Sequence, residues 1–333
     1  MTSPRYDVLG IGNAIVDVIA RAEDDFLVAQ KMQKGTMALI DEERAQAIYA
    51  AMGPAVESSG GSAANTIAGV ASFGARAAFV GKVRDDELGG VFAHDIRASG
   101  VAFETPAAKD GPSTARCYIM VTPDGERTMN TYLGAAQNLQ PQDIDEAQVA
   151  AAAITYLEGY LWDPPQAKAA FVKAAAAAHK AGRMVALTLS DAFCVDRYRD
   201  EFLKLMRDKT VDLLFANEAE LKSLYQTADF DTALSVLRQD ARLAAVTRSE
   251  KGCVVVSGEM IEAVPAFPVA KVVDTTGAGD LFAAGFLFGY ARGADHKTAG
   301  RLGALAAAEV IQHVGARPEV SLAMLARERG IAV

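Results

Sequence analysis

The stretch that decides the fold is Asp274-Thr275-Thr276-Gly277-Ala278-Gly279-Asp280, which runs directly into the apolar segment LFAAGFLFGYA of residues 281–291. Its two glycines let the backbone turn tightly and approach a ligand closely. The segment predicts a helix over residues 278–291, whose first turn offers free N–H groups and a positive dipole end to an anion. Asp280 lies in that turn, where a carboxylate can accept a proton from a hydroxyl. From these residues alone, the segment can equally be an ordinary glycine-rich turn without a binding role, in which the helix dipole favours an aspartate near the N-terminus.

Working outward, short apolar runs alternate with helical patterns along most of the chain. The expected strands are 6–11, 77–80, 154–157, 184–189, 212–216, 243–247 and 253–256, and the expected helices are 62–73, 87–99, 166–180, 196–207, 218–225, 278–291 and 296–311. This alternation predicts an α/β fold with a mostly parallel sheet and helices on both faces.

Two stretches, Asp17–Ala38 and Val101–Tyr132, break this rhythm with short alternating runs. The second contains the turn sequence Thr122-Pro123-Asp124-Gly125. Both stretches predict antiparallel strands outside the main sheet. We therefore expect one domain over residues 1–333, with a small β-lid formed by insertions at about 14–40 and 101–133.

The composition argues against several classes of protein. The net charge of −9 and the lack of a basic run disfavour nucleic acid or an anionic membrane as a partner. No apolar stretch is long enough for a membrane span, and the first residues lack the apolar core of a signal peptide. Cys117, Cys194 and Cys253 are few and widely spaced, which disfavours disulfides and structural zinc. We therefore expect a cytoplasmic protein.

Two further motifs accompany the first. Gly60-Gly61-Ser62-Ala63-Ala64-Asn65 opens a predicted helix and is followed by Phe73-Gly74 and by the segment VGKVRDDELG at 80–89; Asn217-Glu218-Ala219-Glu220 joins a predicted strand to a helix. Together, in this order, the three motifs resemble the signatures of the ribokinase-like (PfkB) family of sugar and nucleoside kinases. The resemblance covers nearly the whole chain. It implies a ribokinase-like fold, ATP as phosphoryl donor, Mg²⁺ and a small acceptor with a hydroxymethyl group.

The resemblance also implies roles for residues around the phosphates. Asp280 resembles the catalytic base, and the backbone of Gly277, Ala278 and Gly279 resembles the anion hole for the transferring phosphate. Asn217 and Glu220 resemble the pair that organises Mg²⁺ and the ATP phosphates, largely through water, which suits a sparse set of magnesium ligands. As an alternative, Glu220 is a solvated acid at a helix start.

Thr247-Arg248-Ser249-Glu250-Lys251-Gly252 occupies the place of the family's T-x-G-x-x-G nucleotide loop. Ser249 replaces the first glycine there, so Thr247 and Gly252 are the expected ATP contacts. The predicted helix 296–311 resembles a wall of the adenine slot. Its alternative role is simple core packing.

Two charged residues are also assigned by the resemblance. Asp274, with carbonyls near Thr276, Val310 and Gly315, matches the placement of a monovalent cation, such as K⁺, beside the anion hole. Arg127 stands where a lid arginine approaches the ATP phosphates. The alternatives are a turn-forming aspartate and a surface lid charge.

The acceptor end is Gly10-Ile11-Gly12-Asn13-Ala14-Ile15-Val16-Asp17, where a strand ends. Asp17 can accept two hydrogen bonds from a vicinal diol, and Asn13 can donate and accept. The GxG pattern also fits a dinucleotide site of the Rossmann type, but its third glycine and its later acid are missing. Asp17 can equally be a strand-end residue beside a sugar pocket.

Four stretches, 12–17, 125–132, 188–193 and 212–218, resemble adenosine kinases more than ribokinase itself. In that case Asp17 and Asn65 bracket the ribose diol, and the turn at Gly61 and Ser62 presents the Ser62 hydroxyl to the purine. The slot for the base would be lined by Ile15, Met37, Cys117 and Leu133.

The expected function is therefore an ATP-dependent kinase that converts adenosine to AMP. A sugar kinase acting on fructose, ribose or a ketodeoxy sugar acid is the alternative. A non-catalytic nucleotide-binding protein is disfavoured because the base and the glycines are intact. The only partners expected are ATP and the acceptor, in a monomer or in a homodimer paired through the lid edge.

Overall fold

The computed structural model describes residues 3–331 and contains a nine-stranded main sheet. The strand order is β14-β13-β12-β11-β10-β9-β1-β5-β6. The strands from β12 to β6 are parallel, and β13 and β14 extend the sheet as an antiparallel hairpin. Their bounds are β1 Tyr6–Ile11, β5 Ala77–Val80, β6 Val101–Phe103, β9 Ala152–Glu158, β10 Met184–Thr188, β11 Leu213–Asn217, β12 Leu243–Thr247, β13 Cys253–Ser257 and β14 Met260–Val264.

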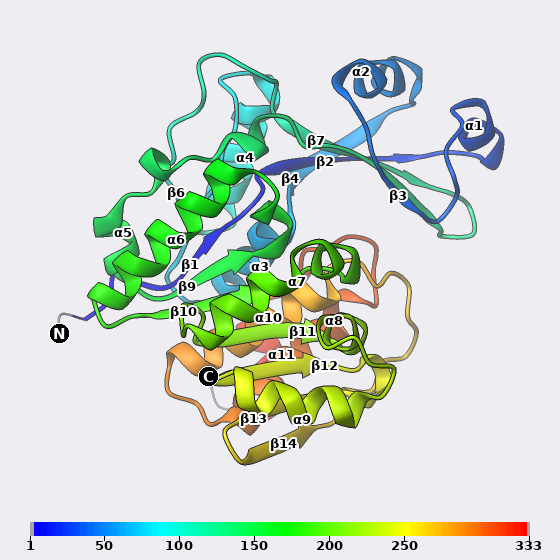
Figure 1. Cartoon of the computed structure of the whole chain (residues 1–333). Helices are drawn as coiled ribbons and strands as arrows, with labels where there is room; N and C mark the ends of the chain where they lie inside the picture. The colour runs from blue at the N-terminus through cyan, green and yellow to red at the C-terminus, as the bar shows by residue number, and fades with distance from the viewer. Residues whose placement is uncertain (1–2, 332–333) are drawn as a thin grey trace.

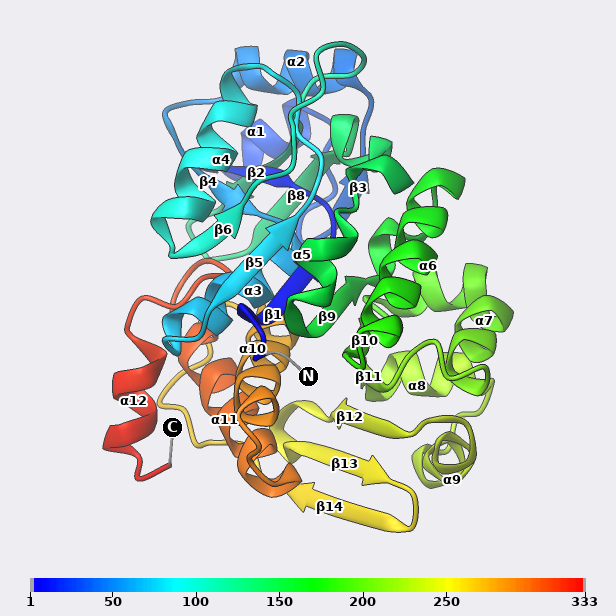
Figure 2. The ribbon, with the colours of Figure 1, turned by 90° about the vertical axis from the view of Figure 1, so that its left-hand side faces the viewer.

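Helices cover both faces of this sheet (Figure 2). One face carries α3 Ser62–Ser72, α4 Glu87–Ala98, α10 Ala278–Ala291, α11 His296–Val310 and α12 Leu322–Glu328. The other carries α5 Glu146–Ala150, α6 Pro165–Lys180, α7 Ala192–Arg207, α8 Glu218–Leu224 and α9 Phe230–Asp240. Successive strand residues enter opposite cores, as Val8 and Leu9 of β1 do. The expected α/β fold is thereby confirmed.

A second sheet of five strands stands beside the main one and forms the lid (Figure 1). Its order is β3-β8-β7-β2-β4, with bounds β2 Ile15–Arg21, β3 Met37–Leu39, β4 Ala55–Gly60, β7 Ala115–Val121 and β8 Arg127–Tyr132. Helices α1 Asp24–Ala29 and α2 Glu42–Ala51 cover one face, where Leu27 and Ile48 join a core with Val16 and Val18. The opposite face, which carries Ile15 and Asp17, is free of these helices.

The lid differs in two ways from the sequence-based boundaries. Val101–Phe103 pairs with β5 in the main sheet, because this apolar run returns to the sheet after α4 like the other strands. Ala55–Gly60 supplies a lid strand that we did not expect, since its sequence AVESSG lacks an apolar alternation. The lid sheet is also mixed: β2 runs parallel to β7, and β3 parallel to β8.

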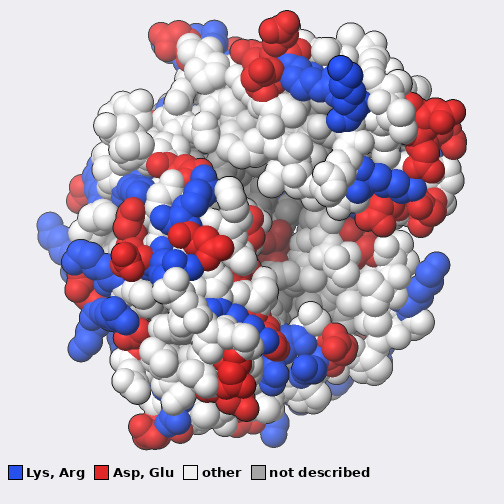
Figure 3. Space-filling view, turned by 45° about the vertical axis from the view of Figure 1, so that its right-hand side comes forward, with Lys and Arg blue, Asp and Glu red and all other residues white. Residues whose placement is uncertain are grey.

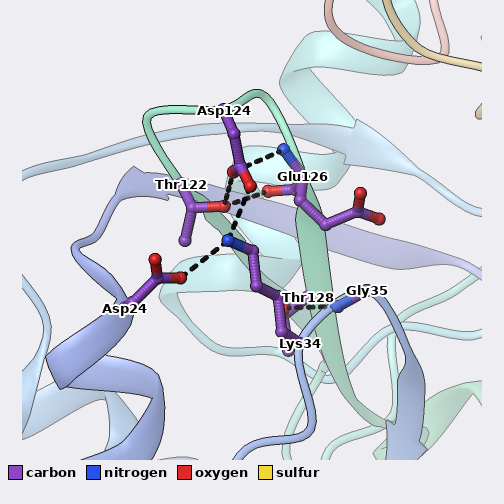
Figure 4. Close-up of polar contacts among 7 residues, drawn as sticks. All are labelled: Asp24, Lys34, Gly35, Thr122, Asp124, Glu126 and Thr128. Carbon is purple, nitrogen blue, oxygen red and sulfur yellow. Dashed lines mark hydrogen bonds and ion pairs between the residues drawn. The ribbon is translucent and has the colours of Figure 1, made fainter.

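A lysine ties the outer end of the lid together (Figure 4). Lys34 donates hydrogen bonds of 2.7 Å to Asp24 of α1 and 2.7 Å to Asp124 in the turn between β7 and β8. The neighbouring Gly35 N–H donates to the Thr128 hydroxyl on β8. These contacts join the two lid insertions into one unit.

The remaining regular segments are short 3₁₀ helices at Gly134–Asn138, Pro141–Asp143, Gly159–Trp162 and Ser249–Lys251. Over residues 3–331, none of the helices has the length and apolar character needed to cross a bilayer.

Candidate active site

The order of the strands places a crevice at the carboxyl ends of β1 and β9. From β1 the chain builds outward through β5 and β6, and then returns to β9 and builds the other side of the sheet. Ligands of open α/β sheets bind at such a switch point. Asn13 follows β1, and Glu158 ends β9, so both lie at this point. The space-filling view shows a hollow near the middle of one face, with acidic side chains visible in it (Figure 3).

Two helix N-termini meet around Asp280. Asp280 lies in the first turn of α10, and Ser62 and Asn65 lie in the first turn of α3. The Ser62 hydroxyl donates to Asp280 Oδ1 at 2.6 Å, and Asn65 Nδ2 donates to Asp280 Oδ2 at 3.2 Å. Burial raises the pKa of Asp280, and these donors work against that rise. The structure thus brings the first two sequence motifs together, although Ser62 faces the carboxylate rather than an open purine position.

The turn before α10 has the geometry expected of an anion hole. Gly277 is the N-cap with φ at 78°, and a Cβ there would lie 2.8 Å from the Ala316 Cα. The first helical hydrogen bond runs from Leu281 N to Gly277 O at 2.8 Å. The N–H groups of Gly279 and Asp280 precede that bond and can therefore be offered to a phosphate. Gly279 is exposed, with open space where a Cβ would lie.

Asp17 faces this site from the lid strand β2. Burial raises its pKa to about 6, the charges of Arg127 and Arg317 lower it, and the charge of Asp280 raises it further. A Cβ on Gly60 would lie 2.3 Å from the Asp17 carboxylate, so a larger residue at position 60 would displace that carboxylate. Asp17 and Asp280 are therefore two carboxylates of one site, approaching it from the lid and from the main body.

Asn13 is held by a residue that the sequence analysis missed. Glu158 accepts hydrogen bonds from Asn13 Nδ2 at 2.6 Å and from the Ala63 N–H at 2.8 Å. Its carboxylate is almost fully buried, and burial raises its pKa to about 7. Asn13 Oδ1 is buried without a hydrogen-bond partner among residues 3–331, which leaves it an acceptor for a ligand group. The sequence signal was present: an acid directly ends an apolar strand.

Arg317, in the segment after α11, is the second missed residue. Its Nε donates to Asn65 Oδ1 at 2.8 Å, and its Nη2 donates to the Ser59 carbonyl at 2.8 Å. No local pattern marks it, because it reaches the site only through the packing of the C-terminal segment.

The lid also places some of the expected slot residues on one face. Ile15 and Asp17 alternate along β2, and Asp17 lies opposite Cys117 of β7. Met37 on β3 is 48% exposed, and Leu133 directly follows β8. The buried Cys117 thiol has its pKa raised to about 12, so it is a neutral wall rather than a nucleophile. The contact of these side chains with a base is part of the proposal below.

At the nucleotide end, Asn217 and Glu220 form a reciprocal capping box on α8. The Asn217 side chain accepts from the Glu220 N–H at 2.8 Å, and Glu220 Oε2 accepts from the Asn217 N–H at 2.9 Å. Thr247 ends β12, and Gly252 begins the return with φ at 82°. A Cβ on Gly252 would lie 2.1 Å from the Val264 carbonyl oxygen, so this turn requires glycine.

These residues fit Mg²⁺ only as an ion carried by the nucleotide. Over residues 3–331, the structure has no group of three or more His, Cys, Asp or Glu side chains that could hold a metal. Glu220 is buried and committed to its capping box, and burial raises its pKa to about 7. Mg²⁺ commonly keeps several waters and binds substrate phosphates beside one or two carboxylates, which matches this sparse arrangement.

Asp274 is not open to a cation in this arrangement. Its carboxylate forms a buried ion pair with Arg127 and accepts from the N–H groups of Thr276 at 2.9 Å and Gly315 at 3.0 Å. Although burial acts to raise its pKa, these donors hold the pKa of Asp274 below its ordinary value. A potassium ion at Oδ2 of Asp274 would compete with Arg127 for that oxygen. Arg127, expected beside the phosphates, therefore lies next to the turn that would hold them.

Comparison with known proteins decides the family. The model of the pfkB family carbohydrate kinases matches residues 39–322. The chain belongs to the pfkB carbohydrate kinase family. This kinase is also 30% identical over 236 residues to probable fructokinase-3 of Arabidopsis thaliana, covering 68% of each chain. As in related kinases of this family, its reaction is phosphoryl transfer to a hydroxyl group, so it is a phosphotransferase.

Two solved structures are similar over almost the whole length. The adenosine kinase from Sinorhizobium meliloti is 58% identical, with a TM-score of 0.91 over 98% of this chain and 99% of that one. A probable sugar kinase protein from Rhizobium etli is 54% identical, with a TM-score of 0.92 over 99% of this chain and 100% of that one. One of these two similar structures is described as an adenosine kinase and the other as a probable sugar kinase, so the same fold is associated with two classes of phosphate acceptor.

Proposed function

We propose that this kinase transfers the γ-phosphoryl group of ATP to the 5′-hydroxyl of adenosine and releases AMP and ADP. The observation that carries the proposal is the pairing of two carboxylates in one site. Asp280 lies at the anion hole with Ser62 and Asn65, and Asp17 faces it from the lid. A nucleoside has matching polar groups, a 5′-hydroxyl for the first carboxylate and a ribose diol for the second. The 58% identity to the adenosine kinase of Sinorhizobium meliloti supports this choice of acceptor.

Asp280 acts as the general base in this proposal. It takes the proton of the acceptor hydroxyl as the oxygen forms a bond to the γ-phosphorus, and the bond from that phosphorus to the β–γ bridging oxygen breaks. The N–H groups of Gly279 and Asp280 stabilise the charge that develops on the transferring group, whereas the Ala278 N–H, expected in the anion hole, donates to the Thr275 carbonyl. Arg127, held by Asp274 beside this turn, adds positive charge near the phosphates.

The chain's polar residues have separate tasks at the two substrates. Asn13, oriented by Glu158, and Asp17 hold the acceptor, while Thr247 and Gly252 contact ATP. Mg²⁺, when bound with ATP, supplies positive charge to the phosphates, and Asn217 and Glu220 would hold it through water.

We also propose that the protein works in a reducing cytoplasm. The three cysteines described in the structure are free and buried, which is consistent with that location.

A sugar kinase is the second candidate, because the curated relatives that match at about 30% identity are fructokinases. The two candidate functions differ in the substrate group that would cover the face of the lid that carries Ile15 and Cys117. A purine would cover this apolar wall, and a free hexose would leave it exposed to water.

Steady-state kinetics with adenosine, inosine, fructose, ribose and a ketodeoxy sugar acid, followed by ADP release, test the proposal. We expect adenosine to have the highest kcat/KM. A sugar with a higher kcat/KM would replace the acceptor and leave the phosphotransferase reaction intact. If no acceptor raises ADP release above the background hydrolysis of ATP, the proposed function is wrong.

A further inference from the structure

Arg317 has no part in the scheme above, yet it lies in direct contact with the site. It comes from the segment between α11 and α12 and is partly buried. Its guanidinium donates to Asn65 on α3 and to both the carbonyl oxygen and the hydroxyl of Ser59 on β4, at 2.8, 2.8 and 3.0 Å. An arginine that holds two separate elements in this way fixes their relative positions.

The contact with Asn65 determines which way its amide faces. Because Oδ1 accepts from Arg317, the amide presents its NH₂ group to Asp280, where Nδ2 donates at 3.2 Å. A rotated amide would place an oxygen against the Asp280 carboxylate, which repels it. The second N–H of the Asn65 amide is then available to a hydroxyl of the acceptor, and a hydroxyl that accepts from it can donate its own proton to a carboxylate such as Asp17.

The contact with Ser59 extends the network to the lid. Ser59 belongs to the lid strand β4, and its N–H and hydroxyl donate to Asp95 Oδ2 of α4 at 2.7 and 2.6 Å. Arg317 thus connects the inner end of the lid to the helix that carries Asn65. The charges of three carboxylates, those of Asp95, Asp17 and Asp280, act to raise the pKa of this guanidinium.

The charge of Arg317 acts on both carboxylates of the site. Burial lowers the pKa of Arg317 to about 10, so the side chain is still cationic at neutral pH. Its charge works against the burial that raises the pKa of Asp280 and of Asp17. The other titratable groups that sense Asp280 are acids or phenols, namely Asp17, Glu158, Tyr156 and Tyr160. Arg317 opposes them at Asp280, and at Asp17 it does so together with Arg127.

We propose that Arg317 is a positioning residue for phosphoryl transfer, which fixes the Asn65 amide and places a positive charge beside the carboxylates of Asp280 and Asp17. The proposal rests on the assignment of Asp280 as the base. It does not depend on the acceptor, because the network lies on the side of Asp280 and holds for adenosine or a sugar.

Two variants separate the charge of Arg317 from its geometry. Arg317→Gln keeps a donor and removes the charge, and Arg317→Lys keeps the charge and loses the two-pronged contact. We measure kcat and kcat/KM from pH 5 to 9 with whichever acceptor the unmodified enzyme phosphorylates fastest. In the Gln variant the acidic limb of the profile should move up by about 1 pH unit, the scale for loss of a nearby opposite charge. In the Lys variant the limb should stay in place, while the acceptor KM rises several-fold.

Arg97→Gln is the matched control. Arg97 lies on α4 outside the network and donates to the Phe103 carbonyl at 2.8 Å. The pH profile of the Arg97→Gln variant should therefore match that of the unmodified enzyme. An unshifted limb in a folded Gln variant, or an equal shift in the Lys variant, would overturn the proposal. If the Gln variant does not fold, an unchanged KM and kcat in the Lys variant would overturn it as well. The variant Asp280→Asn tests the assignment of Asp280 as the base separately from the role of Arg317. Full turnover in that variant would show that Asp280 is not the base, whatever the Arg317 variants show.

Discussion

Asp280 combines two properties that a general base needs at a phosphate site. Burial raises the pKa of Asp280, which makes its carboxylate a better proton acceptor, while Ser62, Asn65 and Arg317 oppose the rise and favour the ionised form. Its place in the first turn of α10 puts it beside the N–H groups that would hold the phosphoryl group. In the proposed reaction, a single side chain would therefore couple proton transfer to the anion hole.

Replacing Asp280 by Asn should abolish proton transfer and leave the ATP contacts in place. The substitution keeps the shape of the side chain and its ability to accept from Ser62. We expect kcat to fall by about 10²-fold or more, the scale of a lost general base. ATP affinity, measured by calorimetry, serves as the control and should stay within a few-fold. Near-normal turnover would show that another group is the base.

Asp17 should control discrimination at the ribose diol. A buried carboxylate left without its hydroxyl partner is costly, so 2′-deoxyadenosine should be a clearly poorer substrate than adenosine. Asp17→Ala should narrow this difference in kcat/KM. Because the pKa of Asp17 is raised to about 6, its carboxylate becomes protonated as the pH falls through 6, and the preference for adenosine should shrink there. An unchanged ratio in the variant would place the diol elsewhere.

How far the sequence predicts the site depends on where each side chain comes from. Asp280, Ser62 and Asn65 belong to contiguous motifs, so their types and spacing carry a signal in the sequence itself. Glu158 and Arg317 have no such motif. They enter the site only because β1 lies beside β9 and because the segment after α11 folds back onto α3. The sequence does mark Glu158 as an acid at the end of an apolar strand, but it does not show which residues pack against it, and Arg317 has no local signal at all.

At the scale of elements, the turn before α10 joins backbone conformation to chemistry. Gly277 takes a left-handed conformation that side chains rarely adopt, and it packs against Ala316. Gly279 has neither restriction. The two glycines of one motif therefore differ in role, since Gly277 allows the turn and Gly279 leaves open space where we propose that the nucleotide binds.

Substitution by alanine should distinguish these two glycines. Gly277→Ala introduces strain and a close contact with Ala316, and should lower the free energy of unfolding by about 1–3 kcal/mol. Gly279→Ala should leave the melting temperature nearly unchanged, because the new methyl group meets no protein atom. It should weaken ATP binding, because the methyl group would occupy space that the nucleotide needs. Thermal denaturation together with ATP titration checks both. Equal melting temperatures for the two variants would contradict this division of roles.

The ion pair between Arg127 and Asp274 predicts an unusual response to potassium. Since the guanidinium already fills the carboxylate, turnover should be similar in potassium and in tetramethylammonium salts of equal ionic strength. Arg127→Gln frees Asp274, so its residual turnover should become several-fold faster in potassium. The rate ratio between the two salts is the measurement. Strong potassium activation of the unmodified enzyme would mean that Arg127 leaves Asp274 during the reaction.

Elements with strong local patterns could be predicted almost to the residue. Helix α10 and strand β1 have the expected bounds, because an apolar run follows a clear start signal in each. Strand β4 was missed since its residues are mostly polar and exposed, and it exists only because β2 pairs with it. Helices α1, α2, α5, α9 and α12 and strand β14 were also not expected.

At the scale of the whole molecule, the lid and the main body each contribute one carboxylate to the site. Neither part is complete alone, because Asp17 is on β2 and Asp280 on α10. A kinase must also exclude water from the γ-phosphate, or ATP is hydrolysed instead. Closure of the lid over the acceptor would meet both needs, with the network of Arg317 at its inner end.

A crystal structure with adenosine and a non-hydrolysable ATP analogue tests the central claim most directly. The account predicts the 5′-oxygen of adenosine within hydrogen-bond reach of Asp280, the ribose diol on Asp17, and a lid closer to the main body than in crystals without acceptor. An adenosine bound with its 5′-oxygen away from Asp280, or absent from the crevice while the analogue is bound, would contradict it.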